Sequence, residues 1–259
     1  MRHCKLCLQK RKLVKAHSIP EAFFRKLRSG GVSPLIVSTV KGNFTKRSPI
    51  GIYDEGILCE VCEPTFGSTD EYGIEVLLNQ FGTHFHALER DGALVGFESN
   101  SVDSLRLLQF LVAVLWRASV STHSFYTNVN LGKYEDLASN FLAGGEDVFH
   151  VFDAVISKWH EEGENVPTTA ILDPRREELL GVNTFRIYFG EVVAYVKVDS
   201  QSFNRKLQAI SLRGNPKVLV VGRVMSKSND YRALITTAKL SNVYAAGFRN
   251  APQKILGAE

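Results

Sequence analysis

The chain has 259 residues, of which 44% are hydrophobic and 22% charged, a composition typical of a globular protein with a sizeable core. No apolar run approaches the roughly 20 residues that a helix needs to cross a bilayer, and the start lacks the apolar stretch of a secretory signal, so we expect a cytoplasmic protein without membrane contact. The net charge of +4 is unevenly distributed, because residues 1–53 carry twelve Lys and Arg against the single acid Glu21, a net +11, which leaves −7 for residues 54–259.

All four cysteines fall into two Cys-x-x-Cys pairs, Cys4 with Cys7 and Cys59 with Cys62. A Cys-x-x-Cys turn directs two thiolates at one ion, and two such turns complete a tetrahedral Cys4 site that binds zinc structurally and leaves no open position. The alternative is a pair of redox or incidental motifs. A thioredoxin-type motif needs a βαβ setting, which neither pair has, so we predict a structural Zn²⁺. Paired zinc-type cysteines also suit a reducing cytoplasm.

The segment between the pairs predicts a strand, a short helix and a hairpin. The strand covers residues 12–20 and ends at Pro20, which suits the first turn of a helix over residues 21–27 that Ser29-Gly30-Gly31 ends. Residues 35–40 and 43–45, around Lys41-Gly42, predict the hairpin. After the second pair, apolar spacing predicts a helix over residues 64–81. These parts, in this order, are those of a treble-clef zinc module.

The rest of the chain changes from helical to β character. Residues 83–100 form a connector with one expected strand, and helices are expected at 102–119, 134–142 and 148–160. Residues 184–189 and 192–198 predict a hairpin and residues 217–221 a further strand, whereas the pattern after Tyr231 assigns no element. We therefore expect an α+β protein with an N-terminal treble-clef module (1–85), a helical region (86–165) and a β-rich C-terminal region (166–259).

The N-terminal motifs resemble those of the HNH endonucleases, a family with a ββα-metal fold. The resemblance rests on the first cysteine pair, on Ala16-His17-Ser18-Ile19-Pro20, and on residues 53–58 leading into Cys59-x-x-Cys62-Glu63. Within that family it is similar to a mostly uncharacterised bacterial and phage subgroup, and it extends over residues 4 to about 75. The resemblance implies that His17 is the general base that activates water for attack on a phosphodiester. It also implies a divalent ion that stabilises the leaving oxygen.

The sequence departs from the family pattern at the positions that usually bind this ion. Ala16 stands where Asp or His is common, Asp54 replaces the central Asn, and Glu63 follows the second pair in place of His or Asn. Asp70 lies two helical turns after Glu63, on the same helix face. Asp54, Glu63 and Asp70 are therefore candidate ligands for Mg²⁺ or Mn²⁺, which prefer oxygen. The alternative is that they are a solvated helix face or capping charges.

The basic N-terminal segment is a candidate nucleic-acid contact, because clustered Lys and Arg side chains are the electrostatic footprint of phosphate binding. The alternative is a solvated face. The candidate contacts are Lys10, Arg11, Lys12, Lys15, Arg25, Lys26, Arg28, Lys46 and Arg47.

The sequence favours a metal-dependent HNH-like nuclease acting on DNA, with His17, Asp54, Glu63 and Asp70 as the candidate catalytic residues. One alternative is a non-catalytic zinc-stabilised module that binds nucleic acid, which Ala16 and Asp54 favour. Another is a protein-interaction module whose basic face meets an acidic partner. His17 itself has a structural alternative, as a hydrogen-bonded histidine that stiffens the module.

Overall fold

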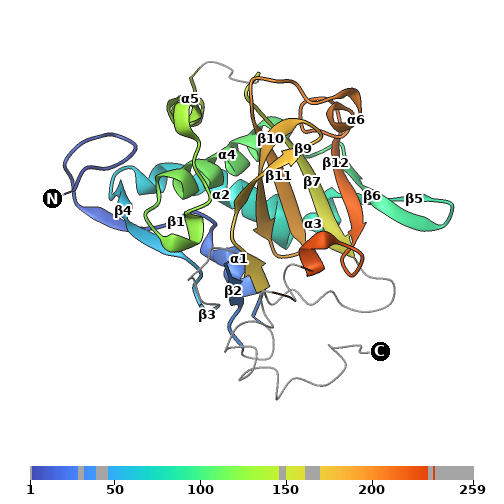
Figure 1. Cartoon of the computed structure of the whole chain (residues 1–259), viewed down its shortest axis with the longest axis horizontal. Coiled ribbons are helices and arrows are strands. Elements are labelled where there is room, and N and C mark those ends of the chain that lie inside the picture. Colours follow the sequence, from blue (N-terminus) through green and yellow to red (C-terminus); the bar gives the residue numbers. More distant parts are fainter. Residues whose placement is uncertain are drawn as a thin grey trace.

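The computed structural model of the chain describes residues 2–28, 32–38, 46–145, 150–160, 170–232 and 236. These residues form the expected mixed α+β protein, with a large sheet, two small sheets and several helices (Figure 1). Of the helices in this part of the chain, none has both the length and the apolar run that crossing a lipid bilayer requires.

The N-terminal part contains the predicted strand and helix. Strand β1 (Leu13–His17) pairs antiparallel with β4 (Tyr53–Cys59), and α1 (Glu21–Lys26) begins directly after Pro20. A three-stranded sheet joins β2 (Leu35–Val37) to β3 (Lys46–Arg47) and, in parallel, to β8 (Ala170–Leu172). The first strand of the predicted hairpin is confirmed as β2, its predicted second strand at 43–45 lies with residues 39–42 outside the described residues, and the observed partner β3 begins at Lys46.

The helix predicted over residues 64–81 forms as a chain of consecutive helical segments. They are the 3₁₀ turn η1 (Glu63–Phe66), α2 (Gly67–Ile74), the π-helical segment η2 (Glu75–Asn79) and α3 (Phe81–His84). Helix α2 packs closely on α4 (Ser104–Val120). Gly73 of α2 leaves no room for a side chain, because an added Cβ atom would lie 2.3 Å from the Phe110 ring of α4. The side chain of Asp103 caps α4 by accepting hydrogen bonds from the backbone N–H groups of Leu105 and Arg106.

Helix α4 is the buried centre of the molecule, as its nearly all-round apolar sequence predicts. It packs against α2, against α5 (Glu135–Leu142) and against strands of the large sheet, with the 3₁₀ turns η3 (Ser124–Tyr126) and η4 (Gly132–Tyr134) between the two helices. The rings of Phe23, Phe110 and Phe189 meet at centroid distances of 4.9 to 6.1 Å and join α1, α4 and the sheet in one core.

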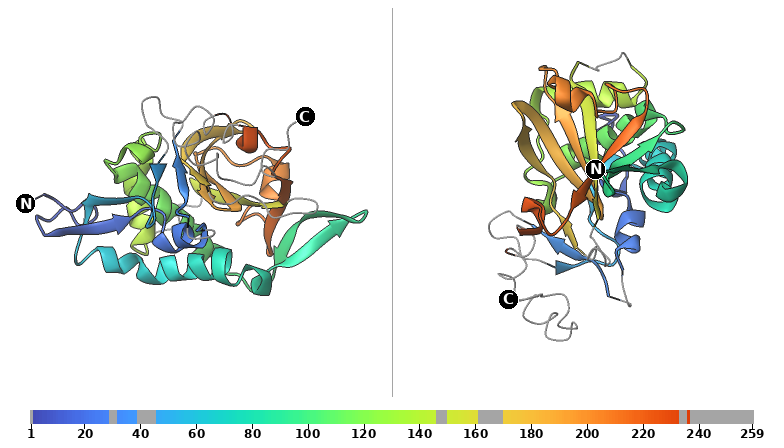
Figure 2. Two further views of the ribbon diagram at one scale, coloured as in Figure 1. Left: turned by 90° about the horizontal axis from the view of Figure 1, so that it is seen from below. Right: turned by 90° about the vertical axis from the view of Figure 1, so that its right-hand side faces the viewer.

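The large sheet has seven strands in the order β5-β6-β12-β7-β11-β10-β9, and all neighbours except β12 and β7 are antiparallel. Figure 2 (left) shows that the sheet is strongly curved, and Figure 1 shows that the β5–β6 hairpin projects from the body. The hairpin and the strand predicted near the C-terminus are confirmed. The predicted hairpin corresponds to β10 (Val182–Phe189) and β11 (Val192–Val198), and the predicted strand to β12 (Val218–Val224). The remaining elements are β5 (His86–Arg90), β6 (Ala93–Ser99), β9 (Arg175–Leu179) and α6 (Arg205–Gln208).

The helix predicted over residues 148–160 is wrong. Residues 148 and 149 lie outside the described residues, and Phe152–His160 form strand β7. This strand lies between β11 and β12 and is buried on both faces, so its sequence lacks the alternation that marks a half-exposed strand. The connector expected to hold one strand contains two, β5 and β6. The described part of residues 86–165, predicted to be helical, therefore contributes three strands to the sheet besides α4 and α5.

Candidate metal centre and the residues around it

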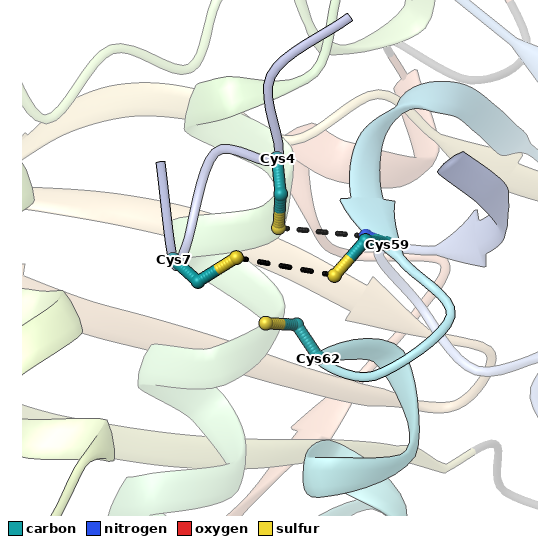
Figure 3. Close-up of side chains that lie close together, drawn as sticks. All are labelled: Cys4, Cys7, Cys59 and Cys62. Carbon is teal, nitrogen blue, oxygen red and sulfur yellow. Dashed lines mark hydrogen bonds between the residues drawn. The ribbon is translucent and has the colours of Figure 1, made fainter. Parts of the chain in front are cut away.

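The four cysteine sulfurs lie close together, as Figure 3 shows. Cys4 and Cys7 lie on a turn before β1, Cys59 is the last residue of β4, and Cys62 directly precedes η1. All four sulfur atoms lie within 4.8 Å of one another, and those of Cys7 and Cys59 are 3.9 Å apart. A tetrahedral ion with metal–sulfur bonds of about 2.3 Å places its ligands about 3.8 Å apart, whereas a disulfide needs about 2.05 Å. The cluster therefore fits one metal ion.

Backbone hydrogen bonds hold the two cysteine turns against each other. Lys5 donates its N–H to the carbonyl of Ile57 at 2.8 Å, and Cys59 donates its N–H to the sulfur of Cys4 at 3.4 Å. We refer to the two cysteine turns with β1, β4 and α2 as the cysteine module.

The environment of Cys59 favours its thiolate. Burial opposes ionisation of the thiol, but backbone N–H groups of Cys62 and Val61 donate to the sulfur, and its pKa is lowered to about 7. Metals bind cysteine as thiolate, so this environment assists binding. Among the described residues, the cysteines are the one group of three or more Cys, His, Asp or Glu residues that a metal ion could bridge.

His17 ends β1 opposite Tyr53, and its imidazole has a fixed orientation. Its Nε2 atom lies 3.0 Å from the carbonyl oxygen of Ile50. A carbonyl oxygen only accepts, so Nε2 carries the hydrogen, and in the neutral ring Nδ1 keeps the lone pair. Burial lowers the pKa of His17 below its usual 6.5, and the hydrogen bond to Ile50 opposes this only in part. The structure thus holds a neutral imidazole whose accepting atom is Nδ1.

Asp54 lies in β4 and is fully engaged by hydrogen bonds. Its carboxylate accepts from the N–H of Gly56 at 2.7 Å, from the hydroxyl of Ser121 at 2.8 Å, and from the N–H and hydroxyl of Thr122 at 2.7 and 3.1 Å. Burial raises the pKa of Asp54, but these donors outweigh it and lower the pKa below the usual 3.8. Asp54 therefore ties β4 to the segment that follows α4.

Asp70 forms a bidentate ion pair with Arg117 of α4. The guanidinium nitrogens lie 2.7 and 2.6 Å from the two carboxylate oxygens, and the Arg117 side chain is 4% exposed. The apolar setting of Arg117 in the sequence indicates an internal acid as partner, and Asp103 or Glu135 would be the nearest in the chain. An internal acid is confirmed as the partner, but it is Asp70, because Asp103 caps α4 and Glu135 accepts from Ser119.

Glu63 begins η1 directly after Cys62, is half-buried, and its charge acts on His17. The structure does not unite the four predicted catalytic residues into a metal-ligand group, since the group of cysteines is the one found in the described chain. Asp54 and Asp70 instead have structural partners, which sequence spacing does not reveal. The sequence did not predict the carbonyl of Ile50 as the partner of His17, or the hydroxyls of Ser121 and Thr122 as partners of Asp54. None of these residues belongs to a recognisable motif.

The predicted nucleic-acid contacts all lie at the surface. The nine side chains, Lys10, Arg11, Lys12, Lys15, Arg25, Lys26, Arg28, Lys46 and Arg47, belong to exposed residues of the first turn, β1, α1 and β3. Lys15 lies 3.8 Å from Glu55 and Arg25 lies 2.8 Å from Glu21, and Arg47 donates to the carbonyl of Ser33 at 2.7 Å. Exposed pairs of this kind are weak, so these cations remain available to a polyanion.

Comparisons of the chain with family models, with curated proteins and with solved structures find no match.

Proposed function

We propose that the cysteine module is a zinc-stabilised, treble-clef-like unit that carries the general base of an HNH-type, metal-dependent nuclease acting on DNA. The observation that carries the proposal is the hydrogen bond from Nε2 of His17 to the carbonyl of Ile50. This bond selects the tautomer in which Nδ1 accepts a proton, and the lowered pKa keeps the ring neutral near pH 7.

The choice of zinc follows from the donor set. Four thiolates in a tetrahedral arrangement are typical of structural Zn²⁺, and a complete sulfur shell leaves no position for a substrate. The order of parts supports the treble-clef comparison, because a cysteine turn precedes β1 and a second turn joins β4 to η1 and α2. The metal would then hold the hairpin that ends in His17.

In the proposed reaction, Nδ1 of His17 removes a proton from a water molecule as the water oxygen bonds to phosphorus. The phosphorus–oxygen bond to the leaving group breaks, and the leaving oxygen takes a proton from solvent. A Mg²⁺ or Mn²⁺ ion, when bound, would neutralise charge on the phosphate. Glu63 is the remaining candidate ligand, and one or two carboxylates with substrate phosphates suffice for Mg²⁺. Asp54 and Asp70 become positioning residues, because they fix β4 and α2.

The exposed basic residues supply the proposed DNA contact. Lys and Arg side chains that neutralise phosphates release counterions, so the affinity for DNA should fall steeply as the salt concentration rises. Seven of the nine lie in or directly beside β1 and α1 in the chain, and these two elements flank the segment from His17 to Pro20. A polyanion held by them would therefore approach the candidate base.

The test is cleavage of plasmid and single-stranded DNA by the zinc-loaded full chain with added Mg²⁺ or Mn²⁺. His17→Ala should lose cleavage by about 100-fold or more while its zinc content and melting temperature stay near those of the wild type. His86→Ala, at an exposed histidine of β5, is the matched control and should cleave normally. Cleavage that persists in His17→Ala would contradict the assignment of the base.

A second candidate function is a non-catalytic, zinc-stabilised module that binds nucleic acid or a protein. It is favoured by Ala16 at a usual ligand position and by the structural partners of Asp54 and Asp70. Absence of cleavage by the wild type would support it. Steeply salt-dependent binding of DNA would then indicate a nucleic-acid partner, whereas no binding of DNA would indicate an acidic protein partner.

A further inference from the structure

A cavity of about 320 Å³ lies where α1, the segment η2–α3 and the turn between β10 and β11 meet. Its lining includes none of the cysteines and none of the predicted catalytic residues. Most of its wall is apolar and comes from segments far apart in the chain, namely Phe23, Leu27, Leu77, Leu78, Phe189 and Val192. A concave apolar site of this size with a few polar groups is the usual form of a small-molecule site.

Two features indicate that specific local structure shapes the wall of the cavity, and that the cavity is not a gap from poor packing. Leu77 and Leu78 belong to the π-helical segment η2, and π-helical turns are rare and frequent at functional sites. On the opposite side, Gly190 has φ +76° and sits so close to α1 that an added Cβ atom would lie 3.0 Å from Leu27. The floor is rigid, because the rings of Phe23 and Phe189 pack at 4.9 Å.

The polar groups of the cavity carry a net positive charge. Lys158 forms an ion pair with Glu191, and its ammonium lies 5.5 Å from the centre of the Phe81 ring. Lys26 adds a second ammonium from the exposed side of α1. Two cations against one carboxylate favour a ligand with a single negative charge.

We propose that this cavity binds a small amphipathic anion, a medium-chain fatty carboxylate, with its tail on the aromatic floor and its carboxylate at Lys26. The cavity contains none of the proposed catalytic residues, but Lys26 is also one of the proposed DNA contacts. The apolar wall accounts for the tail, and the excess positive charge at the rim accounts for the carboxylate.

Isothermal titration calorimetry of the full chain with decanoate, below its micellar concentration, tests the proposal. One molecule should bind saturably, and octanoate should bind more weakly by about fourfold for each of the two lost methylenes. Decylammonium, with the same tail and the opposite charge, should bind more weakly than decanoate. Absence of saturable decanoate binding, or equal binding of decylammonium, would overturn the proposal.

Two variants place the ligand in this cavity. Gly82 lines the cavity and has no atom within 4 Å of an added Cβ, so Gly82→Leu should fill the tail site without strain and remove decanoate binding. Gly67→Leu, at another helical glycine with the same free space, is the matched control and should bind normally. Lys26→Gln should weaken binding by up to about fivefold, whereas Lys206→Gln on α6 should not. Wild-type affinity in Gly82→Leu, with its fold verified by circular dichroism, would refute the site.

Discussion

The cysteine module and the large sheet reach order in different ways. In the sheet, every residue of β11 is buried and β7 is covered on both faces, so burial of mostly apolar strands accounts for much of its stability. In the module, β1 has a single buried residue, Ala16, and β1 and β4 pair with no third strand among the described residues. A two-stranded hairpin is marginal in water. The core of the module comes mainly from β4, through Ile57 and Leu58, and a metal bound by the cysteines would add to it by linking the two cysteine turns.

Removal of the metal should have the largest effect and should separate the two regions. Chelation of the zinc-loaded protein should abolish amide protection in residues 2–17 and 53–66, because structural zinc contributes on the order of 10 kcal/mol to the folding of such sites. Hydrogen exchange measured by mass spectrometry checks this. Peptides from β7, β10 and β11 in the same sample are the internal control and should stay protected. Unchanged exchange in the module would contradict a structural role for the metal.

Loss of the ion pair between Asp70 and Arg117 should have the next largest effect, because it joins the module to α4. Arg117→Met leaves a carboxylate without its partner beside α4 and should cost about 3–5 kcal/mol of unfolding free energy, measured with urea. The double variant Arg117→Met with Asp70→Leu should recover part of this loss. A cost below about 1 kcal/mol for the single variant would show that the pair does not hold α2 in place.

Asp54→Asn should have a smaller and pH-dependent effect. The change weakens bonds from Ser121 and Thr122 to a charged acceptor and should cost about 1–3 kcal/mol at pH 7. Because the folded state lowers the pKa of Asp54 below 3.8, its stabilisation is complete above that pH and is lost as the pH falls through the folded-state value. Urea unfolding of both proteins at several pH values should therefore give curves that converge in acid. A gap that stays constant in acid would contradict this account.

Leu8→Gly should have the smallest effect and the opposite sign. Leu8 follows the first cysteine pair with φ 59°, a backbone conformation that favours glycine, and the substitution should stabilise the module by up to about 1 kcal/mol. Thermal melting of the zinc-loaded protein measures it. Gln9→Gly, at the neighbouring exposed residue, lacks this strain and should destabilise slightly. Destabilisation by Leu8→Gly would show that this turn is not strained.

The sequence allowed prediction of those features that depend on local spacing. The paired cysteines predicted the cysteine cluster, and the strand patterns around Gly190 predicted the β10–β11 hairpin. Strand β7 was predicted as a helix, because a strand buried on both faces lacks the alternation of apolar and polar residues that identifies a half-exposed strand. The partner of Arg117 lies 47 residues away in the chain, and the partners of Asp54 lie 67 and 68 residues away, so tertiary packing alone decides these roles.

We propose that a hairpin held by the metal presents His17 as a neutral base. The most direct test is the rate of DNA cleavage by the zinc-loaded protein in Mg²⁺ as a function of pH. The rate should rise with an apparent pKa below 6.5 and then stay level through neutral pH, because burial lowers the pKa of His17 and the neutral ring is the active form. No cleavage at any pH, or a rate that rises only above neutrality, would contradict it.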